Sequence, residues 1–147
     1  MYLLDTNVLS VAAPTKAQPD ESIQEWIREH SHQLYLSVIT LLELNYGLAW
    51  LKHRGAMARA ARLQLWLNAV CGHYAERVLP VDATTALRAG ELVAAARTAG
   101  VRVGSEDAII AATADLRGLV VLTANTRHFA PMAVAQINPF RELPSVC

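Results

Sequence analysis

Three acidic residues of this chain stand where a carboxylate could do chemistry. Asp5 directly follows the apolar run YLL, Glu43 lies among leucines in TLLELNY, and Asp107 falls early in SEDAIIAATA. Each has an ordinary explanation on its own, since acids cap helices, occupy solvated helix faces and favour the first helical turn. If the fold brings the three together, like charges raise one another's pKa, and a divalent cation would relieve the repulsion.

The available donor atoms indicate which cation and which reaction to expect. Mg²⁺ takes oxygen ligands, usually one or two carboxylates with water and substrate phosphate, whereas Zn²⁺ favours His or Cys at metal-ligand spacing. The two cysteines, Cys71 and Cys147, match neither a metal-ligand spacing nor a disulfide framework. A carboxylate-held divalent ion can activate water and stabilise charge on a phosphodiester, so metal-assisted phosphoryl hydrolysis is the leading reaction class.

Short apolar runs alternate with helical patterns along the chain, which predicts an α/β fold built on a parallel sheet. The sequence predicts strands at 2–4, 34–36, 78–81, 119–123 and 134–139. We expect helices to begin after the capping residues Asp20, Ser37 and Asp82. The carboxyl ends of parallel strands share one edge, where ligands bind, so polar residues just beyond each strand are site candidates.

Two long helices, predicted around residues 39–70, form a helical hairpin. In the first of them, apolar residues recur at near-helical spacing, which predicts an apolar face. That face comprises Ile39, Leu42, Tyr46 and Trp50.

Composition sets few limits on the substrate. A chain of 147 residues fits one domain without a linker and buries a sizeable core. Thirteen basic residues balance thirteen acidic ones, so only a local basic patch could attract nucleic acid. Hydrophobic residues make up 53% of the chain, which fits either a partner surface or a large core. We expect a cytoplasmic protein with no leader and no membrane span.

Four stretches together resemble the PIN-domain family, in particular the VapC-type ribonuclease toxins of bacterial toxin–antitoxin pairs. They are LLDTNV at the start, SVITLLELNYG before the hairpin, SEDAIIAATADLRGLVVLTANTRHF, and VAQINPF near the end. They span nearly the whole chain in the order found in the family. The resemblance implies a single PIN domain over residues 1–147, with a three-layer α/β/α fold and a central, mainly parallel sheet of about five short strands.

The resemblance also implies a metal-dependent endoribonuclease and assigns roles to individual residues. Asp5 and Asp107 would ligate Mg²⁺, or Mn²⁺ in its place. Glu43 would complete the catalytic cluster, either as a ligand of a second ion or by orienting the attacking water. Thr6 and Thr123 would hydrogen-bond the carboxylates and so orient them.

One position departs from the family pattern. Where the family often has a fourth acid in a Thr-x-Asp pattern, the stretch TAN places Asn125. Its amide oxygen could ligate a metal or hold a water, but it adds no charge. Glu106 and Asp115 are the candidate substitutes, and Asp115, two helical turns from Asp107, fits a surface residue better.

Partners besides RNA are also implied by the resemblance. Members usually pair with a small DNA-binding antitoxin and tend to form homodimers or higher oligomers, and the hairpin of residues 39–70 would supply much of the antitoxin groove. Its stripe with Trp50 and Trp66 fits ordinary core equally well. A basic cluster at the hairpin tip comprises Lys52, His53, Arg54, Arg59 and Arg62. For RNA contact we favour Arg127, beside the site, over that cluster.

Two other functions remain open. Asp5 could be a phosphoryl-accepting nucleophile, although Asn7 stands where haloacid-dehalogenase-like enzymes carry their second aspartate. The chain could also be a catalytically impaired PIN-fold binding module that titrates RNA or an antitoxin, an interpretation that Asn125 alone supports.

Overall fold

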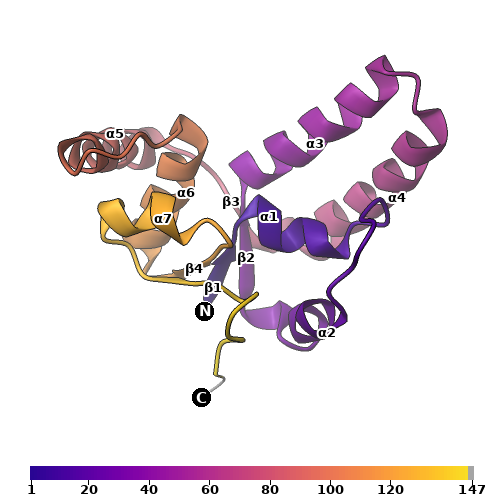
Figure 1. Ribbon diagram of the computed structural model, residues 1–147, viewed down its shortest axis with the longest axis horizontal. Coiled ribbons are helices and arrows are strands. Elements are labelled where there is room, and N and C mark those ends of the chain that lie inside the picture. Colours follow the sequence, from indigo (N-terminus) through magenta and orange to yellow (C-terminus); the bar gives the residue numbers. More distant parts are fainter. Residues whose placement is uncertain (146–147) are drawn as a thin grey trace.

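A five-stranded, fully parallel sheet forms the centre of the protein (Figure 1). The computed structural model describes residues 1–145, so Cys147 lies outside the described residues. The strands are β1 (Tyr2–Leu4), β2 (Leu34–Ser37), β3 (Val78–Leu79), β4 (Val120–Leu122) and β5 (Gln136–Ile137). Their order in the sheet is β3-β2-β1-β4-β5, which places β1 in the middle and β5 at one edge.

Helices cover both faces of this sheet. They are α1 (Thr6–Leu9), α2 (Glu21–Glu29), α3 (Val38–His53), α4 (Met57–His73), α5 (Ala83–Thr98), α6 (Ser105–Arg117) and α7 (Thr126–Phe129). Figure 1 shows α1 to α4 on one side of the sheet and α5 to α7 on the other. The predicted three-layer α/β/α fold with a central parallel sheet is therefore confirmed.

The two layers of the core follow from the alternation of side chains along the strands. Leu4 and Leu122 pack into the cluster formed with α1 to α4. Leu3 and Val121, one residue earlier in each strand, pack into the cluster formed with α5 to α7. All four side chains are fully buried, as expected for strands covered on both faces.

Local signals fix where the elements begin and end. Asp20, Ser37 and Asp82 cap α2, α3 and α5, and each side chain accepts a hydrogen bond from a backbone N–H of its helix. Gly118 ends α6 in the left-handed conformation, at φ 62°, which a glycine adopts without strain. The predicted strand 78–81 is shorter in the structure, ending at Leu79, because Pro80 has no N–H to donate to a neighbouring strand.

Most of the predicted apolar face of the first hairpin helix lies on the surface and is not part of the core. Helix α3 buries Leu44 and Leu48, on a different side from the expected stripe. Leu42, Tyr46 and Trp50 are instead exposed, at 58%, 68% and 53%. The two faces read alike in sequence because α3 is apolar on nearly all sides, and only packing against α4 decides which face is covered.

The apolar character of the chain is distributed over many short elements. No helix among residues 1–145 is long and apolar enough to cross a membrane.

Candidate active site

Asp5 lies at the carboxyl end of the central strand β1, where the chain turns directly into α1. It is the N-cap of α1, and its Oδ1 accepts a hydrogen bond of 2.7 Å from the backbone N–H of Thr6. The capping role and a role at the sheet edge are therefore combined in one carboxylate. The residue is 4% exposed, yet no salt bridge to it is found among residues 1–145.

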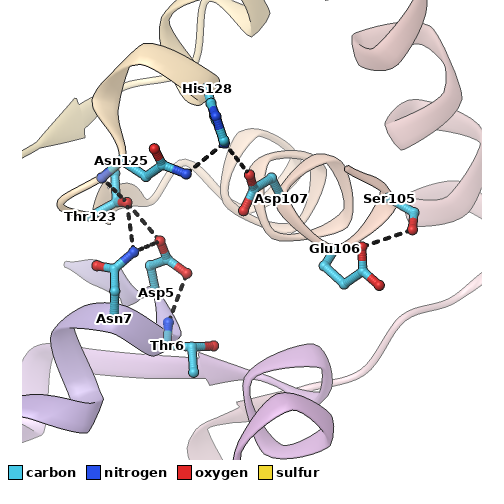
Figure 2. Close-up of polar contacts among 9 residues, drawn as sticks. All are labelled: Asp5, Thr6, Asn7, Ser105, Glu106, Asp107, Thr123, Asn125 and His128. Carbon is cyan, nitrogen blue, oxygen red and sulfur yellow. Dashed lines mark hydrogen bonds and ion pairs between the residues drawn. The ribbon is translucent and has the colours of Figure 1, made fainter. Parts of the chain in front are cut away.

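The second oxygen of Asp5 is held from the neighbouring strand. Thr123, which follows β4, donates from its hydroxyl to Asp5 Oδ2 over 2.6 Å, and the Asn7 amide donates to the same oxygen over 2.5 Å. Asn7 also accepts a hydrogen bond of 2.9 Å from the backbone N–H of Ala124. Asn7 therefore ties the β1 end to the β4 end and fixes the orientation of the Asp5 carboxylate (Figure 2).

Glu43 reaches this region from the second turn of α3. The hydroxyl of Thr6 donates a hydrogen bond to Glu43 Oε2. Thr6 therefore joins the α3 carboxylate to the end of β1, since its own backbone N–H binds Asp5. The side chain of Glu43 is partly buried, so its carboxylate is only partly solvated.

Asp107 approaches from the opposite side, in the first turn of α6. Its Oδ2 lies 2.8 Å from Nδ1 of His128 in α7, and the Asn125 amide nitrogen lies 2.5 Å from the same ring nitrogen (Figure 2). One ring nitrogen cannot donate to Asp107 and accept from Asn125 at once. Nδ1 therefore either donates to Asp107, when it carries the ring hydrogen, or accepts from the Asn125 amide, when it does not.

The electrostatics link the three acids. Burial raises the pKa of Asp5, and the charge of Asp107 raises it further, against the lowering effect of the hydrogen bonds from Thr123, Thr6 and Asn7. Burial also raises the pKa of Glu43, and the charges of Asp5 and Asp107 add to that effect, while the Thr6 hydrogen bond opposes it. The structure therefore brings Asp5, Glu43 and Asp107 close enough to repel one another.

Other predicted site residues lie at the margin of this cluster or away from it. Glu106 is exposed and accepts a hydrogen bond of 2.9 Å from Ser105 (Figure 2). Its charge adds to the effects that raise the pKa of Glu43, so Glu106 lies at the margin of the cluster. Asp115 forms an ion pair of 2.8 Å with Arg88 of α5 and is not part of the acidic cluster. Arg127 is exposed next to His128.

Two contacts of the site were missed from sequence. Asn7 was compared only with the second aspartate of haloacid-dehalogenase-like enzymes, although an amide two residues after Asp5 is within reach of its carboxylate. His128 was not among the predicted site residues, although it lies three residues after Asn125, one helical turn along α7.

The donor set fits a divalent cation that is held partly by water. Among residues 1–145, no group of three or more His, Cys, Asp or Glu side chains is arranged to hold a metal ion by itself. Mg²⁺ needs no such cage, because it usually keeps several waters and binds one or two carboxylates. Within residues 1–145 Asp5 is a buried carboxylate without a cationic partner, and such a group is costly unless a cation neutralises it.

Comparison with known proteins reveals relatives across nearly the whole chain. The family model of the PIN domain matches residues 2–134. The VapC ribonuclease Y4jK of Sinorhizobium fredii is 38% identical over 145 residues, which cover 95% of this chain and 98% of that protein. A tRNA(fMet)-specific endonuclease VapC of Shigella flexneri is 31% identical over 130 residues, which cover 87% of this chain and 89% of that protein.

Solved structures also match nearly the whole chain. The crystal structure of FitAcB from Neisseria gonorrhoeae superposes with a TM-score of 0.83 at 34% identity, covering 95% of this chain and 99% of that one. VapBC-5 from Mycobacterium tuberculosis, a member of the VapBC family of toxin–antitoxin systems, has a TM-score of 0.63 at 27% identity. It covers 92% of this chain and 94% of its own.

Proposed function

We propose that this chain, which belongs to the PIN-domain family, is a metal-dependent endoribonuclease and the toxin of a toxin–antitoxin pair. The observation that carries the proposal is the buried carboxylate of Asp5 at the carboxyl edge of the sheet, which has no ion pair among residues 1–145 and is coupled by charge to Asp107 and Glu43. The names of the relatives support RNA as the substrate, since they include a VapC ribonuclease and a tRNA-specific endonuclease.

In this proposal Asp5 and Asp107 hold Mg²⁺, or Mn²⁺ in its place, and water completes the coordination. When bound, the ion would polarise a phosphodiester oxygen and make water a stronger nucleophile. Thr123 and Asn7 keep the Asp5 carboxylate in one orientation through hydrogen bonds to Oδ2. Such contacts to a ligating carboxylate commonly change metal affinity or activity by about 10- to 100-fold.

Glu43 acts as a proton acceptor for the attacking water. Its raised pKa makes it more basic than an ordinary glutamate, which favours proton transfer near neutral pH. The Thr6 hydroxyl orients the carboxylate by donating to Oε2, which leaves Oε1 able to accept from a water.

Asn125 has a different role from that of a fourth acid. Its backbone N–H donates to the Thr123 hydroxyl over 2.9 Å, and its amide contacts His128. Asn125 therefore supports both Thr123, beside Asp5, and His128, beside Asp107. We assign it to positioning and expect one tightly held metal ion, since the fourth carboxylate is missing.

The proposed partners follow from the relatives. A match to a VapBC toxin–antitoxin system supports an antitoxin as the partner of this chain. A homodimer or higher homo-oligomer is the proposed assembly. Because the proposed substrate is cellular RNA, we propose that the chain acts in the cytoplasm.

A cleavage assay tests the function. Purified, antitoxin-free protein is incubated with total cellular RNA in Mg²⁺, in EDTA, and as the variants Asp107→Asn and Asp115→Asn. We expect discrete fragments from the wild type and from Asp115→Asn in Mg²⁺, and none in EDTA or from Asp107→Asn. Absence of fragments in every lane, from folded protein, would contradict the proposal and favour a binding module.

A further inference from the structure

We propose that Thr40 is a positioning residue of the candidate site, which acts by holding the first turn of α3, and with it Glu43, against the end of β1. The inference rests on the proposed function, because it names a residue that sets the geometry of the same site. Thr40 is not one of the acids and was not among the predicted site residues. Its side chain is fully buried, so it cannot itself contact RNA.

The hydroxyl of Thr40 reaches from α3 to the central strand of the sheet. It donates a hydrogen bond of 3.4 Å to the backbone carbonyl of Leu4, which is the last residue of β1 and directly precedes Asp5. Thr40 and Glu43 are three residues apart on α3, or about 4.5 Å along the helix axis. The bond therefore joins two points of the backbone, each next to one of the candidate catalytic acids.

Two other helical threonines of this protein bond differently. The hydroxyls of Thr98 and Thr113 donate to the carbonyl four residues earlier in their own helices, a common arrangement for threonine. Thr40 lies in the first turn of α3, where the residue four positions earlier, Leu36, belongs to β2. The Thr40 hydroxyl is thus available for a contact outside its helix, and that contact is made with β1.

Packing alone does not require a hydroxyl at this position. Thr40, Leu44 and Leu48 are the buried residues of α3, and they recur every four residues along one face. Valine has nearly the shape of threonine and avoids the cost of burying a hydroxyl. At 3.4 Å the bond is long for an O–H···O contact, so its contribution to stability is small. The hydroxyl is therefore better explained by the geometry that it sets than by the stability that it adds.

Repulsion between the acids favours a shift of α3 away from β1. The charges of Asp5 and Asp107 raise the pKa of Glu43, so the fold holds these carboxylates close together against a repulsive force. The Thr6 hydroxyl opposes the shift, but its contact depends on the side chain of Glu43 itself. Thr40 opposes the shift through the backbone of β1, so it holds the helix whichever way the Glu43 side chain turns.

The carboxylate of Asp5 is oriented without Thr40. Its two oxygens are held by three donors, from α1 and from the residue that follows β4, and Thr40 is not one of them (Figure 2). Loss of the Thr40 hydroxyl should therefore displace Glu43 and leave the proposed metal ligand Asp5 in place. The expected defect is in the catalytic step, with little change in metal binding.

Cleavage kinetics test the positioning role. The substrate is a labelled oligonucleotide that spans a site cleaved in total RNA, and kcat and KM are measured in saturating Mg²⁺. We expect Thr40→Val to lower kcat by about 3- to 10-fold with KM unchanged, because the buried side chain affects a catalytic group and not RNA binding. Thr40→Ser keeps the hydroxyl and should retain most of the activity. Thr113→Val removes an equally buried hydroxyl from α6 and, as the matched control, should cleave like the wild type.

A double-mutant cycle shows whether Thr40 acts through Glu43. Glu43→Gln removes the proposed proton acceptor, so a residue that only orients Glu43 can no longer influence the rate. Adding Thr40→Val to Glu43→Gln should therefore change kcat by less than about twofold. The same fold-loss in both backgrounds would overturn the inference. A loss in Thr113→Val as large as that in Thr40→Val, or no recovery in Thr40→Ser, would do so as well.

Thermal unfolding in EDTA, at about pH 8 where ordinary carboxylates are ionised, gives a measurement that does not depend on cleavage. Glu43→Gln should raise the Tm of the wild type by about 2–4 °C, because it relieves repulsion within the cluster. It should raise the Tm of Thr40→Val by less than half as much, because there the first turn of α3 is already free to move away from β1. Equal increases in both backgrounds would overturn the inference. Failure of the proposed function gives a different result, in which the wild type cleaves no RNA but the two increases in Tm still differ.

Discussion

Asp5 and Asp107 supply the two proposed metal ligands from different structural settings. The Asp5 side of the site lies between β1 and β4, where the residue is 4% exposed and three donors fix both carboxylate oxygens. On the Asp107 side, the side chain is 22% exposed, and its one side-chain hydrogen bond within the described part of the chain is to His128, itself 29% exposed. The first carboxylate is held in place by the fold, and the second can adjust.

This difference suits a site whose ligand set is completed by water and substrate. A fixed carboxylate defines where the cation binds, because three hydrogen bonds keep it from rotating. A more exposed carboxylate on the first turn of a helix can move to meet the ion at little cost. We therefore expect variants on the Asp5 side to have larger effects than variants on the Asp107 side that spare the carboxylate.

The largest effect is expected at Asp5 itself. Asp5→Asn keeps a cap for α1 but removes the charge, so cleavage should fall by on the order of 10²–10³ and Mg²⁺ affinity should fall with it. Cleavage rates and calorimetric Mg²⁺ titration measure the two losses. Circular dichroism should show a folded protein, because removing one charge from a repulsive cluster does not expose the core. Loss of activity that tracks a collapsed Tm would instead make Asp5 a structural residue.

The strand and helix boundaries around Asp5 could be predicted from sequence, because neighbouring residues mark them. Strand β1 and Asp5 are marked by an apolar run that stops at an acid, and the caps Asp20, Ser37 and Asp82 occur directly before helical patterns. These signals depend on neighbouring residues only. They also determine which polar residues face the carboxyl edge of the sheet, since that edge follows from parallel pairing.

The remaining features depend on contacts between distant residues. The contact of His128 with Asp107 joins α7 to α6 across 21 positions of sequence, and no sequence signal near either residue predicts it. The buried face of α3 could not be predicted for the same reason, since Leu44 and Leu48 are buried by packing against distant residues, including those of α4. The exposed face with Tyr46 and Trp50 emerged only when that packing was known.

A second test concerns the hydroxyl that orients Asp5. Thr123→Val removes the donor to Asp5 Oδ2 and the acceptor for the Asn125 N–H, so cleavage and Mg²⁺ affinity should each fall by about 10- to 100-fold. Thr113→Val is the matched control, because Thr113 is equally buried but donates only to the Ile109 carbonyl of its own helix. Equal losses in both variants would show a general packing defect and remove the special role of Thr123.

The pH dependence of stability tests how strongly burial affects the Asp5 side of the site. Burial raises the pKa of Asp5 in the folded state, so the folded metal-free protein binds more protons than the unfolded chain. As pH rises above about 4, the pKa of Asp in the unfolded chain, Asp5 therefore lowers the stability of the folded protein. Asn cannot ionise, so the stability of Asp5→Asn relative to the wild type should grow over the same range. Urea unfolding of both proteins in EDTA measures this difference, and saturating Mg²⁺ should reverse it. A difference that is constant with pH would show that Asp5 titrates normally.

The smallest effect is expected at His128. His128→Ala removes the one side-chain contact of Asp107 but leaves the carboxylate on the first turn of α6, where it remains partly exposed and able to reach a cation. A partly exposed contact of this kind contributes about 0.5–1 kcal/mol, so cleavage should fall only about 2- to 5-fold. His128→Gln should restore part of the activity, because its amide can still donate to the carboxylate. A decrease as large as that of Thr123→Val would mean that Asp107 is held as firmly as Asp5, and that both proposed ligands, rather than one, are fixed before the metal arrives.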